Sequence, residues 1–272
     1  MKAIADAPSV KERIAAIEKR IGGRLGVAAL DTGTGKRIEY RADERFAMCS
    51  TFKFLAVAAV LKRVDAGQDS LDRRIPYGPR DLQDYAPVAK QHIGEGAMSL
   101  SALCEAAIEY SDNTAANLIL PIIGGPAGVT RFARSIGDPI TRLDRTEPTL
   151  NVVAVGDPRD TTSPSSMQDD MNRILLGDVL SARARELLVS WLVACKTGDG
   201  RIRAGVPSGW RVGDKTGTWS DGGRGSANDI AILWPPNRPP ILVTSYLTDA
   251  KAPADARNAA HAEIGRIVSE TM

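Results

Sequence analysis

The sequence has little histidine and little cysteine. Its 272 residues include two histidines, His92 and His261, and three cysteines, with no CxxC pair. A zinc site or a Ser-His-Asp triad is therefore difficult to assemble, because both need imidazole close to other ligands or to a nucleophile. Three cysteines also leave at least one thiol outside any intrachain disulfide. We expect no metal site, and we expect any activated serine to use a base other than histidine.

Charge of one sign and long apolar runs are also missing. The 35 basic and 33 acidic residues are interspersed and give a net charge of +2, so the chain shows no footprint for nucleic acid or an anionic membrane. No apolar run approaches the roughly 20 residues that span a bilayer, and the first residues carry no apolar signal core. We expect no nucleic-acid partner, no membrane partner and no cofactor.

Strand-like sequence lies at both ends of the chain, and helical sequence lies between them. The patterns near the ends predict a helix over Val10–Ile21, capped by Ser9 and ended at Gly22, and a closing helix over Ala254–Ser269. The predicted strands are Leu25–Leu30, Lys36–Tyr40, Trp210–Thr216, Asp229–Trp234 and Ile241–Leu247. The helical patterns of the middle are Phe54–Arg63, Leu100–Tyr110, Thr114–Leu120, Ser165–Leu175 and Ala182–Val193.

These patterns predict an α/β protein of the α+β type. We expect a five-stranded antiparallel sheet flanked by the terminal helices, with an inserted all-helical domain. The sheet domain would combine residues 1–50 and 196–272, and the helical domain would span 51–195, including an omega-type loop over 142–160. Small-molecule sites favour such seams, so we expect the active site there.

The first candidate site is Ser50-Thr51-Phe52-Lys53. A spacing of three on a helix brings the lysine amine within reach of the serine hydroxyl. Apolar neighbours on most sides predict a buried Lys53, and burial favours its neutral form. The alternative is a serine helix cap followed by a solvated lysine.

The second string, Ser111-Asp112-Asn113, interrupts a helical region. Its three side chains compete for backbone hydrogen bonds and indicate a break between two helices. Ser111 would shuttle a proton, Asn113 would donate to a substrate carbonyl, and Asp112 would be architectural. A plain N-cap is the alternative.

The third string, Glu147-Pro148-Thr149-Leu150-Asn151, lies in the long segment between Arg142 and Asp160. One short helical turn would aim Glu147 and Asn151 at the same point, which suits a carboxylate base and an amide that hold a water together. Arg145 and Asp160 would pin the ends of the loop, or they would form an exposed pair of little value.

The fourth string, Lys215-Thr216-Gly217-Thr218, follows a predicted strand. Lys215 and Thr216 would bind an anion, Gly217 would allow a close approach, and the amide of Thr218 would complete an oxyanion hole with that of Ser50. The alternative is an ordinary strand end with a turn over 219–225.

The ordered set resembles the class A serine β-lactamases, a family that combines SxxK, SDN and KTG strings. The resemblance covers nearly the whole chain, because flanking strings match as well: Tyr40 to Phe46, Asp81 to Tyr85, Ala115 to Leu120, Asp160 to Met167, and Asp214.

The resemblance implies acylation of Ser50 by a β-lactam, followed by attack of a water activated by Glu147 and held with Asn151. Lys53 and Ser111 would carry protons, and the family leaves open whether lysine or glutamate is the acylation base. Tyr85 would form a wall of the cleft. The substrate carboxylate would be met by Lys215, Thr216 and an arginine, for which Arg201 is the better candidate and Arg224 the fallback. The family also implies a periplasmic or secreted monomer.

The chain departs from the family in two respects. Some carbapenem-hydrolysing members bridge the position of Cys49 to a cysteine where this chain has Trp219, and another common disulfide needs a cysteine where this chain has Val57. We therefore predict three free thiols at Cys49, Cys104 and Cys195. The segment from Trp219 to Ser226 also looks longer and richer in glycine than usual.

Two other functions remain to be weighed. A penicillin-binding transpeptidase or carboxypeptidase shares the SxxK and KTG chemistry, and a non-hydrolytic β-lactam sensor stays acylated. Both should lack the glutamate loop, so Glu147 with Asn151 favours hydrolysis.

Overall fold

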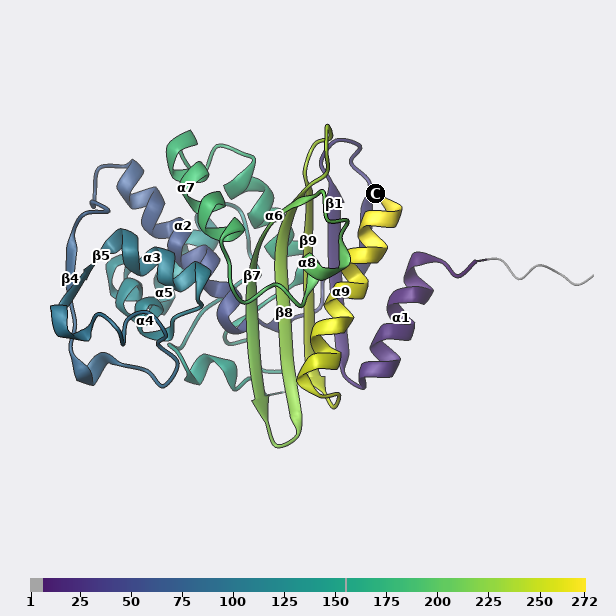
Figure 1. Ribbon diagram of the computed structural model, residues 1–272, viewed down its shortest axis with the longest axis horizontal. Helices are drawn as coiled ribbons and strands as arrows, with labels where there is room; N and C mark the ends of the chain where they lie inside the picture. The colour runs from purple at the N-terminus through teal and green to yellow at the C-terminus, as the bar shows by residue number, and fades with distance from the viewer. Residues whose placement is uncertain (1–6, 155) are drawn as a thin grey trace, which may run out of the picture.

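The computed structural model describes residues 7–154 and 156–272, and a five-stranded antiparallel sheet lies at its centre (Figure 1). The strand order is β2-β1-β9-β8-β7, so strands from both ends of the chain share one sheet and β7 lies at an edge. The prediction of this sheet is confirmed. The strands are β1 (Arg24–Asp31), β2 (Arg37–Tyr40), β7 (Arg211–Asp221), β8 (Arg224–Trp234) and β9 (Ile241–Ala250).

The two terminal helices pack on one face of the sheet. Helix α1 (Val10–Ile21) begins with a Ser9–Glu12 capping box and ends at Gly22 in the left-handed conformation, as predicted. It lies beside α9 (Ala254–Thr271), and its buried isoleucines join an apolar core with the sheet (Figure 1). The short helix α8 (Ile202–Gly205) also packs against α9.

The opposite side of the sheet is covered by the helical half of the molecule. Helix α2 (Phe52–Asp65) lies at its centre, and every residue from Phe52 to Leu61 is buried. A helix that is buried on all sides forms a core and fixes the positions of its neighbours. Around it lie α3 (Leu100–Glu109), α4 (Asn113–Ile119), α5 (Pro126–Ser135), α6 (Pro164–Leu175) and α7 (Ala182–Val193).

The inserted segment is not entirely helical. Strand β4 (Arg74–Pro76) pairs with β5 (Ala97–Ser99), and β6 (Thr161–Thr162) pairs with β3 (Phe46–Ala47) just before the first candidate string. Such short strands leave too few residues for a recognisable alternation in the sequence. Residues 1–6 of the expected sheet domain and residue 155 of the expected loop lie outside the described residues. Within the described ranges, no helix is long and apolar enough to cross a membrane.

The hairpin between β7 and β8 differs from the expectation of a turn over 219–225. Both strands continue into this segment, and Trp219 pairs with Ser226 while Asp221 pairs with Arg224. Only Gly222 and Gly223 remain as the turn, with φ of 55° and 80°. Positive φ at both central residues is typical of a type I′ turn, whose twist suits a two-residue hairpin. The hairpin therefore projects beyond the rest of the sheet (Figure 1).

Candidate active site

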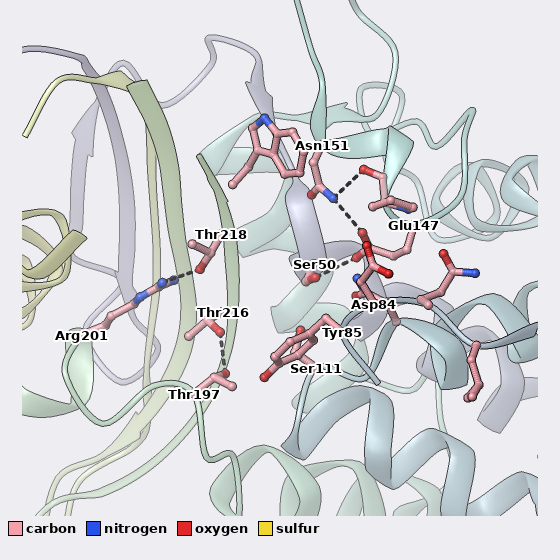
Figure 2. A pocket seen from close by; sticks show the side chains of 15 residues that line it. Ser50, Asp84, Tyr85, Ser111, Glu147, Asn151, Thr197, Arg201, Thr216 and Thr218 are labelled. Atoms are coloured by element: carbon pink, nitrogen blue, oxygen red, sulfur yellow. Dashed lines mark hydrogen bonds between the residues drawn. The ribbon is translucent and has the colours of Figure 1, made fainter. Parts of the chain in front are cut away.

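A cleft of about 620 Å³ lies between β7 and the helical half of the molecule. Figure 2 shows Ser50, Ser111 and Glu147 on one side and Thr216, Thr218 and Arg201 on the other. The structure thus brings all four strings together at one seam. The residues that line the cleft are Ser50, Leu82, Gln83, Asp84, Tyr85, Ser111, Asn113, Glu147, Pro148, Asn151, Thr197, Arg201, Thr216, Thr218 and Trp219.

Ser50 lies in a single 3₁₀ turn, Cys49–Thr51, directly before α2. Its Oγ donates a hydrogen bond to Oε1 of Glu147 (2.8 Å) and accepts one from Nζ of Lys53 (3.0 Å). The preceding residue, Cys49, has a φ of 44°. A non-glycine residue in this region costs of order 1–3 kcal/mol and is typical of functional sites. The Ser50 hydroxyl is thus held between a carboxylate and an ammonium group.

Lys53 is fully buried, as predicted, and is not a solvated surface lysine. Besides Ser50, its Nζ donates to the carbonyl of Ser111 (2.7 Å) and to Oδ1 of Asn113 (2.6 Å), and it lies 3.1 Å from Oε1 of Glu147. Burial lowers the pKa of Lys53 because the buried ammonium loses its hydration, although the Glu147 carboxylate acts in the opposite direction.

Ser111 lies between the two buried lysines. Its Oγ accepts hydrogen bonds from Nζ of Lys215 (2.9 Å) and from Nζ of Lys53 (3.4 Å). Its backbone has a φ of 58°, which lets the chain turn between α3 and α4. This hydroxyl therefore bridges the two lysine ammonium groups.

Asp112 has the architectural position that the sequence predicted. Its carboxylate caps α4 by accepting from the amide of Ala115 (2.9 Å) and also accepts from the amide of Val88 (2.9 Å). The amide of Asn113 donates to the carbonyl of Tyr85 (3.0 Å). These bonds join the loop that carries Tyr85 to the start of α4, so both lie at the rim of the cleft.

Glu147 and Asn151 point at one another from a short 3₁₀ turn, Thr149–Asn151, that follows a cis Glu147–Pro148 bond. Nδ2 of Asn151 donates to Oε2 of Glu147 (2.7 Å). Burial alone would raise the pKa of Glu147, but the charge of Lys53 and hydrogen bonds from Ser50 and Asn151 outweigh it and lower the pKa overall. The carboxylate is therefore ionised at neutral pH.

The two ends of this loop are joined by Arg145 and Asp160. Oδ2 of Asp160 lies 2.5 Å from Nε of Arg145, while its Oδ1 accepts from the amides of Asp144 (2.7 Å) and Arg145 (2.9 Å). The Asp160 side chain is completely buried, so the pair is not the exposed pair of the alternative interpretation.

Lys215 is also fully buried, and its Nζ donates to the carbonyl of Thr216 (2.8 Å) as well as to Ser111. Burial and the nearby charge of Lys53 lower its pKa to about 7. At Gly217, a Cβ would lie 2.7 Å from the carbonyl oxygen of Met48. Glycine is needed there because β7 passes directly against the segment that carries Ser50.

Of the two candidate arginines, Arg201 lines the cleft, whereas Arg224 lines a separate hollow beside the hairpin turn. Nη2 of Arg201 donates to Oγ1 of Thr218 (2.6 Å), and Nη1 donates to the carbonyl of Gly217 (2.9 Å). Nε donates to Oδ1 of Asn258 in α9 (2.9 Å), which fixes the guanidinium at the cleft.

Known proteins share this arrangement. The Beta-lactamase enzyme family matches residues 9–272, and an ancestral (GNCA) class A β-lactamase has a structure with a TM-score of 0.93 and 61% identity, covering 97% of this chain and 100% of the other. This chain is a class A β-lactamase. Relatives include β-lactamase CTX-M-25 of Escherichia coli, 47% identical over 98% of this chain and 90% of its own length. Another is β-lactamase OXY-2 of Klebsiella oxytoca, 45% identical over 98% and 91%.

Sequence reasoning missed several residues that build the site of this β-lactamase. Oδ1 of Asn117 accepts a hydrogen bond from the backbone N–H of Glu147 (3.0 Å), and Nδ2 of Asn117 donates to the backbone carbonyl of Glu147 (2.9 Å). Nδ2 of Asn228 in β8 donates to the carbonyl of Met48 (3.0 Å). The hydroxyls of Thr197 and Thr216 are hydrogen-bonded to one another (2.5 Å). The one available signal was Asn117, because it lies one helical turn after Asn113.

The three cysteines of this β-lactamase are buried and unpaired, in line with the prediction of three free thiols. Burial raises the pKa of the Cys49 thiol to about 12, and burial likewise raises the pKa of Cys195 to about 11. Both thiols therefore remain protonated beside the site. The side chain of Cys49 packs against Gly217, and Trp219 lies two residues after Gly217 in β7.

Proposed function

We propose that this β-lactamase hydrolyses the amide bond of penicillin- and cephalosporin-type antibiotics through an acyl-enzyme on Ser50. The observation that carries the proposal is the contact of Ser50 Oγ with both Glu147 and Lys53 in a buried setting. Oγ attacks the β-lactam carbonyl carbon, the ring C–N bond breaks, and the ring nitrogen takes a proton. Water then cleaves the ester, which releases the ring-opened acid and restores the serine hydroxyl.

Two groups contact the hydroxyl of Ser50, which must lose its proton. In the resting structure Oγ donates to the Glu147 carboxylate, whereas the ammonium of Lys53 donates to Oγ. We therefore assign first acceptance of the proton to Glu147 and stabilisation of the developing alkoxide to Lys53. Ser111, bonded to Lys215 and within reach of Lys53, delivers a proton to the leaving ring nitrogen.

The carbonyl oxygen would lie between the amides of Ser50 and Thr218. The carbonyl of Thr216 accepts from Lys215, so this peptide group faces the open edge of β7. Backbone groups alternate sides along a strand, and the N–H of Thr218 therefore faces the same edge. An oxyanion donor in such a position is worth about 3–4 kcal/mol of barrier.

The substrate carboxylate would be bound by Lys215, Thr216 and Arg201. Thr216 and Arg201 line the cleft, and the ammonium of Lys215 contacts Ser111, which also lines it. The space that Gly217 leaves is occupied by Met48 and Cys49 rather than open to the substrate ring. Asn113 would donate its side-chain amide to the acyl group, and Tyr85, half exposed at the opposite rim, would form the wall facing β7.

Deacylation is the step that separates a hydrolase from a transpeptidase or a sensor. Asn151 holds Glu147 through Nδ2, while its buried Oδ1 has no partner in the part of the chain that the structure describes. This leaves an acceptor beside the base, which suits a water held for attack on the ester.

Turnover tests the proposal directly. The purified protein should hydrolyse a chromogenic cephalosporin many times per active site, and an excess of chelator should leave the rate unchanged. The measurement is the absorbance of the hydrolysed cephalosporin, with much less enzyme than substrate in the assay. A single burst equal to the enzyme concentration would instead support a transpeptidase or a sensor.

The pKa of about 7 for Lys215 predicts a pH effect. Protonated Lys215 attracts the substrate carboxylate, and the charge is lost as pH rises, so kcat/KM should fall above about pH 7. Lys215→Arg keeps its charge and should move this limb to higher pH, whereas Lys62→Arg on the surface of α2 should not. Profiles of kcat/KM from about pH 5 to about pH 10 report the pKa values of groups in the free enzyme. If the decrease in kcat/KM occurs at the same pH in Lys215→Arg, then a group other than Lys215 causes it.

The Arg145–Asp160 pair predicts a stability effect. Asp160→Asn leaves the arginine without its buried counter-ion and should lower the free energy of unfolding by about 3 kcal/mol. Urea denaturation measures the loss. Asp157→Asn, which breaks a surface pair with Arg159 in the same loop, should have a much smaller effect. Equal losses in the two variants would remove the special role of Asp160.

We also propose that the units over residues 1–50 with 196–272 and over 51–195 act as the two walls of the cleft. By analogy with its family, we propose that the enzyme works as a monomer in the periplasm or outside the cell. Sedimentation of the purified protein tests whether it is a monomer, and fractionation of the producing cells tests where it is located.

A further inference from the structure

Strand β7 carries an aromatic side chain into the cleft directly after Thr218. Trp219 is half-buried and lines the same cleft as Asn151. Side chains alternate along a strand, so Trp219 lies on the same face as Gly217. That face packs against the segment carrying Ser50, since a Cβ on Gly217 would meet the carbonyl of Met48 at 2.7 Å. The indole of Trp219 therefore lies past Ser50, at the end of the cleft that the 147–151 loop also lines.

The direction of the bound substrate follows from the same strand. The groups that would bind the substrate carboxylate include Thr216 on β7 and Arg201, and the oxyanion donor Thr218 lies two residues after Thr216 on the same strand. The acyl side chain is attached on the other side of the reacting carbonyl from the carboxylate-bearing ring. It must therefore extend away from Thr216, toward Trp219 and Asn151.

The position of Trp219 is held from outside the cleft by Arg257 of α9. This side chain is 6% exposed. Its Nη2 donates to Oγ of Ser220 (2.8 Å) and its Nη1 to the carbonyl of Trp219 (3.4 Å). Within residues 7–154 and 156–272 it forms no ion pair, and burial lowers its pKa. Both of these side-chain hydrogen bonds are therefore made to the hairpin.

Gly225 makes this contact possible. It pairs with Ser220 across the hairpin, and a Cβ at this position would lie 1.2 Å from Nη1 of Arg257. The guanidinium therefore lies directly on the backbone of Gly225. Any larger residue would displace it, so Gly225 and Arg257 form one clamp on the hairpin.

We propose that Trp219 limits the size of the acyl side chain that the cleft accepts and that Arg257 is the positioning residue that keeps it there. The indole fills the end of the cleft, and the clamp prevents the hairpin from yielding to a bulky group. The inference rests on the proposed function, because it concerns the acyl side chain of a β-lactam.

The test compares two β-lactams with the same ring nucleus, one with an acetyl-sized acyl group and one with a bulky branched aromatic acyl group. Trp219→Ala should raise kcat/KM for the bulky substrate about tenfold and leave the small one within about twofold. Arg257→Gln and Gly225→Ala should shift the ratio in the same direction by about threefold, and Arg257→Lys should restore part of the selectivity. Equal changes for both substrates would overturn the proposal.

Two controls separate positioning from general damage. Arg224→Gln, in the same hollow as Arg257, should leave the ratio unchanged. In the Trp219→Ala background, Arg257→Gln should have no further effect on the ratio, because the group that it positions is gone. Additive effects would remove Arg257 from the proposal. Failure of the parent enzyme to turn over the small substrate would instead contradict the proposed function itself.

Discussion

Replacement of Glu147 by alanine should convert the enzyme from a hydrolase into a protein that stays acylated on Ser50. In this variant the buried Lys53 no longer faces the carboxylate that favours its charged form, so its neutral amine can accept the Ser50 proton in place of Glu147 and a penicillin can still react. The ester then lacks the carboxylate that activates water, and loss of a general base slows such a step by about 10²–10⁴-fold. Mass spectrometry of the intact protein should show an adduct with the full mass of the penicillin, because ring opening releases no atoms.

The matched control is Glu186→Ala. Glu186 is an exposed glutamate on α7, and its removal should leave turnover unchanged with no lasting adduct. Peptide mapping should place the adduct of the Glu147 variant on Ser50. Turnover at the parent rate in Glu147→Ala would remove this residue from the mechanism, and an adduct elsewhere would remove Ser50.

Lys53→Met should have the opposite effect on the adduct and prevent it from forming. The change removes the cation that contacts Ser50, Asn113 and Glu147. It also leaves the buried Glu147 carboxylate without its counter-charge, which raises the pKa of that carboxyl, so that more of it is already protonated and cannot accept the Ser50 proton. We expect acylation to slow by about 10²–10⁴-fold, measured by stopped-flow with a chromogenic cephalosporin.

This variant needs a check on folding, because an uncompensated buried charge costs about 3–5 kcal/mol. The double variant Lys53→Met with Glu147→Gln removes both charges, so it should regain stability in urea while remaining inactive. Lys62→Met, an exposed lysine later on the same helix, should behave like the parent. Normal acylation in folded Lys53→Met would show that the lysine serves the core rather than the chemistry.

Local signals in the sequence predicted the helices most accurately. Helix α1 begins and ends where Ser9 and Gly22 indicate, and α7 covers Ala182–Val193 as predicted. Capping depends on hydrogen bonds within a few residues of the chain, so the sequence contains the whole cause. Helix α5 was missed because only a few of its residues are buried and its neighbours are rich in glycine and proline.

The hairpin shows where local signals fail. The glycines and polar residues of 219–225 favour a turn, yet five of these seven positions pair in the strands on either side of a tight two-residue turn. Pairing with β8 and contact with Arg257, 38 residues after Trp219, decide the outcome. Such long-range contacts stabilise a strand that its own sequence does not favour.

The sequence by itself determined the reaction class, because four ordered strings contain a nucleophile, two lysines, a carboxylate base and an anion clamp. Tertiary structure decided how these groups act on one another. Only the packing of β7 against the nucleophile turn brings Lys215 to Ser111 and lowers its pKa, and only the fold puts Arg201 in the cleft and Arg224 outside it. The physical reason is that pKa shifts and cleft walls depend on distance and burial, which arise between segments far apart in the chain.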